Sequence, residues 1–158
     1  TKAEEVEVFR RRLHQSFPPE PFFGDVTSLC ECDECVALRL NLPGKRWDEV
    51  PPEFIDFNSG SLPLLLPDAL AEFLPAYLIR SMETLDQDCV VAEFTMYFVC
   101  PGNEEEGWDE ERVAGLVSLF DLEQRKAIAD YMRAIVGRSD LRHWHANTEF
   151  GLRCWRPK

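Results

Sequence analysis

The chain has 158 residues, of which 45% are apolar and 11% aromatic, so it can build a folded core and is not a disordered polymer. The formal charge is −12 and is uneven: residues 133–158 carry six basic and two acidic side chains, and the other 132 residues carry 11 basic and 27 acidic ones. Such an acidic surface repels nucleic acids and anionic membranes, and it suits either a basic protein partner or simple solubility.

No apolar run in the sequence is long enough to span a bilayer, and residues 1–17 are charged where a signal peptide would be apolar. These features predict a cytoplasmic protein. The six cysteines are an even number and could pair, but a chain of this length without a secretion signal favours reduced thiols.

Residues 1–17 predict an amphipathic helix, with acidic residues near its start and an arginine triplet later, as the helix dipole favours. Its apolar side consists of residues three and four positions apart, namely Val6, Phe9, Leu13 and Phe17. Pro18 and Pro19 end the helix because the residue before a proline avoids the helical conformation.

A cysteine-rich stretch at residues 30–35 leads into a short helix that we expect to reach Leu42, followed by a turn at Pro43 and Gly44. Trp47 begins a second short segment. Pro51-Pro52 then opens one more helical turn, which carries Phe54, Ile55 and Phe57, and residues 58–60 form a loop.

The most apolar stretch, residues 61–85, predicts the central helix of the fold. Its apolar face has helical spacing and consists of Leu70, Phe73, Leu74, Tyr77, Leu78, Met82 and Leu85. Pro67 suits a first turn, whereas Pro75 removes an interior hydrogen bond. We therefore expect two helical segments, 67–74 and 75–85, joined by a kink.

Residues 88–100 fit a helix or a strand equally well, because their apolar residues satisfy both periods. We expect a helix, since no other segment offers a partner strand to satisfy the backbone groups. The expected buried face of that helix consists of Val90, Val91, Phe94, Tyr97 and Phe98.

Residues 101–108 predict an acidic loop, and Asp109 is a good N-cap for the helix that follows, with Val113, Leu116, Val117 and Phe120 on its buried face. The next helix starts at Asp121, with Gln124 placed for a capping box and Gly137 for a C-terminal cap. Its apolar stripe consists of Leu122, Ile128, Met132, Ile135 and Val136.

The basic stretch 140–158 predicts a short helix and a tail that docks through its aromatic residues Trp144, Phe150 and Trp155. The sum is an all-α fold: an irregular bundle of six or more helices around a Pro-kinked central helix, in a single domain over residues 1–158.

The chain resembles a small uncharacterised bacterial family, a domain of unknown function with a Cys-rich stretch, a Trp, a PxAxxxxLPAYL helix and a late Gln-x-x-Ala-Ile unit. The residues that carry the resemblance are Cys32, Cys35, Trp47, 62–66, 67–78, Phe120 and 124–128. The resemblance spans about residues 30–136 and implies a helical domain of bacterial origin without assigned catalytic residues. Small acidic bacterial proteins of this kind often serve as immunity proteins or interaction modules. This analogy rests on the kind of protein and not on any shared site residues.

Cys30, Cys32 and Cys35 form the sharpest chemical motif, because Cys32-x-x-Cys35 has metal-ligand spacing and Cys30 adds a third thiol. A structural zinc site normally has four ligands, so the remainder has to come from elsewhere; the candidates are His14, His143, His145 and Cys154. The neighbouring acids raise thiol pKa values, which argues against a reactive thiolate. Three inert, partly buried cysteines at a helix start are the alternative interpretation.

A second candidate site is an acidic stretch with one tryptophan, which could bind a basic partner. Its residues are Glu104, Glu105, Glu106, Trp108, Asp109 and Glu110. A solvated loop with a helix cap explains the same residues.

The sequence contains no phosphate-binding glycine loop, no Gly-x-Ser-x-Gly and no His-Glu-x-x-His, so it offers no candidate catalytic residues. The leading hypothesis is an acidic protein-binding module that neutralises a basic partner as immunity proteins do. The alternative is a domain in which zinc links the cysteine motif to the tail, or a metal-dependent enzyme built on that ion.

Overall fold

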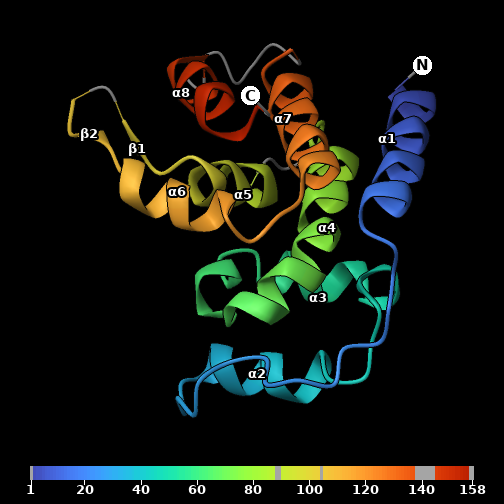
Figure 1. Cartoon of the computed structure of the whole chain (residues 1–158). Coiled ribbons are helices and arrows are strands. Elements are labelled where there is room, and N and C mark those ends of the chain that lie inside the picture. The colour runs from blue at the N-terminus through green and yellow to red at the C-terminus, as the bar shows by residue number, and fades with distance from the viewer. Residues whose placement is uncertain (1, 88–89, 104, 138–144, 157–158) are drawn as a thin grey trace.

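The computed structural model describes residues 2–87, 90–103, 105–137 and 145–156. The described residues form eight α-helices, two 3-10 turns and a small hairpin (Figure 1), which confirms the all-α irregular bundle. The elements are α1 (Lys2–Ser16), α2 (Asp33–Asn41), η1 (Trp47–Glu49), α3 (Pro52–Phe57), η2 (Leu62–Leu64), α4 (Pro67–Thr84), α5 (Val90–Val99), β1 (Gly102–Asn103), β2 (Gly107–Trp108), α6 (Glu110–Val117), α7 (Leu122–Val136) and α8 (His145–Trp155).

The central helix is α4, and most of its side chains are buried. It begins at Pro67, as expected, and runs through Pro75 to Thr84, so the two expected segments belong to one continuous helix. Pro75 removes one backbone hydrogen bond, and its own burial within a packed helix offsets that loss. The ribbon changes direction between its first turns, beside α3, and its last turns, near α1 and α7 (Figure 1).

Helix α1 confirms the first predicted helix and lies against α4 and α7. The rings of Phe9 and Tyr131 stack at 6.2 Å between centroids, which joins α1 to α7. Beyond the end of α1, Phe17 meets the edge of Phe120 at 6.0 Å. These contacts are the tertiary packing that a helix of this length needs for stability.

Residues 90–99 are helical, as expected, but the predicted buried face is partly wrong. The buried residues of α5 are Val91, Ala92, Thr95, Met96, Phe98 and Val99, and three of the expected ones, Val90, Phe94 and Tyr97, are 39%, 50% and 53% exposed. Helix α5 carries apolar side chains on all of its sides, so the period of these residues alone does not show which side faces α4.

Within the stretch expected as an acidic loop, residues 102–103 and 107–108 pair as antiparallel strands of a hairpin, with Gly102 opposite Trp108 and Asn103 opposite Gly107. Gly102 and Gly107 both have positive φ angles, of 110° and 89°, which glycine adopts without strain. The pairing is too short to change the fold class.

The predicted helix caps of α6 and α7 are confirmed. Asp109 accepts a hydrogen bond from the backbone N–H of Arg112 at 3.2 Å. Asp121 and Gln124 form the reciprocal capping box, and Gly137 is the C-cap of α7. Leu122, placed on the buried stripe of α7 by sequence, is 56% exposed because it lies in the first turn, at the edge of the packed face.

The C-terminal helix α8 docks through its aromatic residues, as expected. Trp155 is buried and donates from Nε1 to the carbonyl of Val99 at 2.8 Å, and Phe150 is buried too. Trp144 lies outside the described residues. In the part of the chain that the structure describes, no helix is both long and apolar enough to cross a membrane.

Candidate functional site

Helix α2 lies in the segment of residues 22–45, whose two ends are hydrogen-bonded to each other. Gly44 donates to the carbonyl of Phe22 at 2.6 Å, and Phe22 donates to the carbonyl of Lys45 at 3.1 Å. Gly44 has a φ of 78°, so the turn favours glycine here. The rings of Phe22 and Phe73, on α4, pack edge to face with 5.7 Å between their centroids, which fixes the segment of residues 22–45 to the core.

The loop before α2 is held on two sides. The backbone N–H of Leu66 donates to the carbonyl of Val26 at 2.9 Å, and Thr27 forms a bridge with Leu65. Arg39, on α2, donates from Nη1 to the Thr27 hydroxyl at 2.9 Å and to the Ser28 carbonyl at 2.7 Å. The loop that carries Cys30 is therefore fixed to the helix that carries Cys35.

The sulfur atoms of Cys30, Cys32 and Cys35 all lie within 4.8 Å of one another. Cys32 is the N-cap of α2, and its sulfur accepts from the backbone N–H of Cys35 at 3.4 Å. The Cys30 sulfur accepts from the backbone N–H of Cys32 at 3.5 Å. Cys35 is buried and the other two are exposed, so the cluster has one side against the protein and one side toward solvent. All three are free thiols, as are Cys100 and Cys154.

Two of these thiols differ in acidity. The backbone N–H of Cys35 is the main cause that lowers the pKa of Cys32, because it stabilises the thiolate. The pKa of Cys35 is raised to about 11, first by its hydrogen bond to the Cys32 sulfur and then by burial. The expectation that the neighbouring acids raise the pKa of these thiols is therefore wrong for Cys32, where a direct hydrogen bond from the helix N-terminus dominates.

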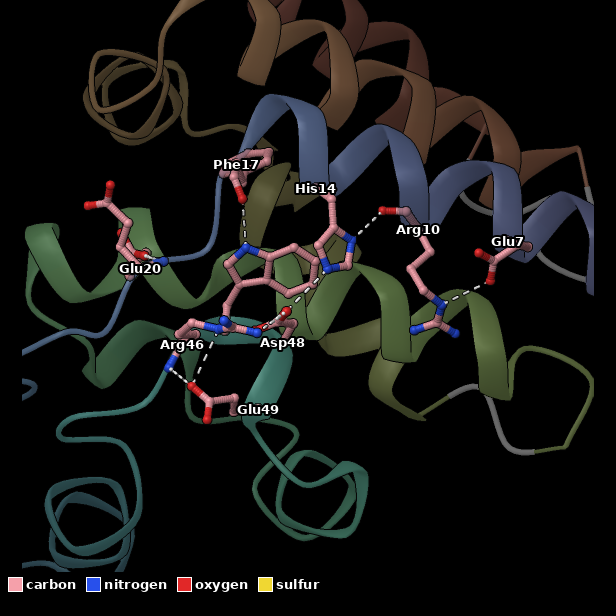
Figure 2. A network of polar contacts seen from close by, with 10 residues as sticks. Glu7, Arg10, His14, Phe17, Glu20, Arg46, Asp48 and Glu49 are labelled. Carbon is pink, nitrogen blue, oxygen red and sulfur yellow. Dashed lines mark hydrogen bonds and ion pairs between the residues drawn. The ribbon is translucent and has the colours of Figure 1, made fainter.

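Among the residues that the structure describes, none of the extra ligands suggested by the sequence joins this cluster. His14 Nδ1 lies 2.9 Å from the Arg10 carbonyl, and Nε2 lies 3.3 Å from Asp48 (Figure 2). Cys154 and the backbone of His145 belong to α8, at the opposite end of the molecule from α2 (Figure 1). His143 lies outside the described residues. A zinc link between the cysteine motif and α8 is thus excluded by the arrangement of the helices.

His14 instead takes part in a polar network that sequence reasoning missed (Figure 2). Its ring lies 4.6 Å from that of Trp47, whose Nε1 donates to the Phe17 carbonyl at 2.8 Å. Arg46 donates two hydrogen bonds of 2.9 Å to the Asp48 carboxylate. These groups are hydrogen-bonded to one another and connect α1 to η1. A small pocket of about 140 Å³ lies beside them.

The acidic candidate site lies on the hairpin and the start of α6. Glu105, Glu106 and Glu110 are exposed, and Asp109 is the N-cap already described. Trp108 is half-buried, and its ring stacks on Phe150 of α8 at 4.9 Å with an 11° angle between the planes. Glu104 lies outside the described residues. The acids therefore stand on a hairpin that Trp108 fixes to α8.

A groove of about 920 Å³ between α1 and α7 was also not foreseen. Its lining includes Val8, Phe9, Met82 and Ala134, with Arg11 and Asp130 beside them. The apolar and charged groups are mixed, so the lining does not select one ligand chemistry.

Comparison with protein-family models, with curated proteins and with solved structures gave no match. The fold and the site define a helical protein with a three-cysteine cluster that could hold a metal ion.

Proposed function

We propose that the protein binds a zinc ion through Cys30, Cys32 and Cys35. The observation that carries the proposal is the clustering of three sulfur atoms within 4.8 Å. Zinc–sulfur bonds of about 2.3 Å in a tetrahedron place the sulfurs about 3.8 Å apart, so small side-chain rotations close the site around the ion. The exposed side leaves the fourth position to water or to a donor from another molecule.

The ion would have a structural role, because it would join the loop before α2 to the first turn of that helix. Cys32 is prepared for it, because the backbone N–H of Cys35 favours its thiolate. Cys35 has to release its proton on binding. Thiols stay available for a metal in a reducing compartment, so the cytoplasm of a bacterium is the location that we propose.

Zinc titration of the reduced 158-residue chain against a chromophoric chelator tests this proposal. We expect one zinc per chain, lost in the double variant Cys32→Ser/Cys35→Ser and retained in the control Cys154→Ser. Cys154 is a suitable control because it is a free thiol on α8, away from the cluster. Equal zinc binding by the wild type and the double variant would refute the proposal.

A second candidate function is the binding of a basic protein, in the manner of an immunity protein. It is supported by the hairpin, which presents Glu105 and Glu106 on a base fixed by the stacking of Trp108 on Phe150. Complementary charge accelerates association and selects partners. Preorganised acids lose less conformational freedom on binding than acids on a free loop.

Reversing Glu104, Glu105 and Glu106 to Lys tests this second function. The variant should retain less of a basic partner from a cell extract, and the remaining binding should depend less on salt. The matched control reverses Glu31, Asp33 and Glu34, which changes the net charge equally at the α2 end of the molecule. Equal losses in both variants would mean that net charge, and not the hairpin, attracts the partner.

A further inference from the structure

The cluster supplies three sulfur ligands, and this number restricts which ions it can hold without a further ligand from solvent or from another molecule. Among the residues that the structure describes, no fourth His, Cys, Asp or Glu atom shares the grouping within 4.8 Å. Cys30 and Cys32 are exposed, so an ion at the cluster faces solvent on its open side. Zinc needs a fourth ligand there. A thiophilic ion that is satisfied by three sulfurs needs none.

We propose that this cluster also binds trivalent arsenic in a pyramidal three-sulfur complex. The inference rests on the proposed metal-binding function and specifies which class of ion suits the site. Thiolates are soft ligands and select soft ions. Trivalent arsenic forms three bonds and keeps a lone pair in the fourth position, so the protein alone completes its coordination and the open side needs no donor.

The reaction is a ligand exchange and transfers no electrons. Arsenous acid carries three hydroxyl groups. Three S–H bonds and three As–O bonds break, three As–S bonds form, and three water molecules leave. The three sulfurs already lie within 4.8 Å of one another, so one arsenic atom can exchange its hydroxyl groups for all three. The thiol protons of Cys30, Cys32 and Cys35 leave with the three displaced hydroxyl groups as three water molecules.

Local structure favours capture by all three sulfurs. Backbone N–H groups face the sulfurs of Cys30 and Cys32, and Arg39 holds the preceding loop on α2. The cysteines at the other end of the molecule are poorer ligands. Cys100 is buried, donates to the Asn147 carbonyl at 2.7 Å and has its pKa raised to about 12, mainly by burial.

The test adds sodium arsenite to the reduced 158-residue chain and measures its mass and its free thiols. We expect a mass gain of one arsenic atom less three protons, and a fall in free thiols from six to three. Each of Cys30→Ser, Cys32→Ser and Cys35→Ser should weaken binding by more than about 100-fold, because loss of a group outside the ligand shell already costs about 10- to 100-fold. Cys154→Ser should leave the affinity unchanged.

Far-UV circular dichroism of each variant checks that it is folded, which matters most for buried Cys35. Loss of only two thiols, or unchanged affinity in Cys30→Ser, would overturn the three-sulfur complex in favour of capture by two cysteines. Zinc binding without arsenite binding would refute this inference and leave the proposed function intact. Arsenite binding without zinc binding would refute the proposed zinc-binding function and leave this inference intact. If the chain bound neither zinc nor arsenite, both proposals would be refuted.

Discussion

The Nη1 atom of Arg39 lies 2.7 Å from the carbonyl oxygen of Ser28. This hydrogen bond, together with the one from the same atom to Thr27, spans from α2 back to the loop before it. The two hydrogen bonds connect the loop that carries Cys30 to the helix that carries Cys35. A residue outside the three-cysteine cluster therefore links the two segments that form it.

Arg39→Ala should weaken zinc binding by about 10- to 100-fold, the usual cost of losing a group that orients metal ligands. The helix should persist, since alanine is a good helix former. Chelator competition measures the affinity, and Arg133→Ala, which removes an exposed arginine of α7, is the control. Equal affinities for the wild type and Arg39→Ala would show that the loop does not need this contact.

Gly151→Ala should destabilise the fold by about 1–3 kcal/mol through overpacking. A Cβ at this position would overlap with Cε of Met132, which is fully buried, and would lie 3.3 Å from Sγ of Cys100. The control Gly115→Ala lies in α6 with open space around it and should stabilise by about 0.5–1 kcal/mol, because alanine favours helix. Urea unfolding compares the two, and equal midpoints would contradict the close packing of α8 on α7.

Asp56→Asn should lower stability at neutral pH but not in acid. Arg80 donates hydrogen bonds of 2.8 Å and 2.6 Å to the Asp56 carboxylate and lowers its pKa. A carboxyl whose pKa is lowered in the folded state stabilises above the unfolded pKa, about 3.9, and this contribution is lost as the pH falls through the lower folded value. The pair is partly exposed, so the difference should stay within about 1 kcal/mol. Melting temperatures of both proteins at pH 7 and below pH 3 measure it, and a constant difference would contradict the pairing.

Trp47→Phe should cost about 1–3 kcal/mol. The substitution removes the indole N–H and leaves the buried Phe17 carbonyl without that donor. Tyr97→Phe, on an exposed ring of α5, is the control and should change stability by less than about 0.5 kcal/mol. Equal effects on the urea midpoint would mean that the hydrogen bond shown in Figure 2 adds nothing.

Features that depend on neighbouring residues in the chain could be predicted from the sequence. Asp121 and Gln124 form a capping box because both partners lie within one helical turn. Cys32 and Cys35 lie together for the same reason, at the start of α2. The helical state of α5 followed from the lack of a partner strand.

Features that depend on distant contacts could not be predicted. The packing of α5 on α4 decides that Phe94 and Tyr97 are exposed, and the sequence of α5 alone contains two plausible apolar faces. The separation of α8 from α2 is a matter of topology, so the sequence alone could not show that Cys154 lies away from the cysteine motif (Figure 1). The contact of Arg39 with the loop before α2 could not be predicted, because a single arginine in a short helix is most often solvated.

Zinc binding by Cys30, Cys32 and Cys35 can be measured by zinc-edge X-ray absorption of the protein, purified without a metal-affinity tag under reducing conditions and then loaded with one zinc per chain. We expect three sulfur neighbours at about 2.3 Å and one lighter atom, oxygen or nitrogen, in the fourth position. A coordination shell of light atoms only, or a spectrum unchanged in Cys32→Ser/Cys35→Ser, would contradict it.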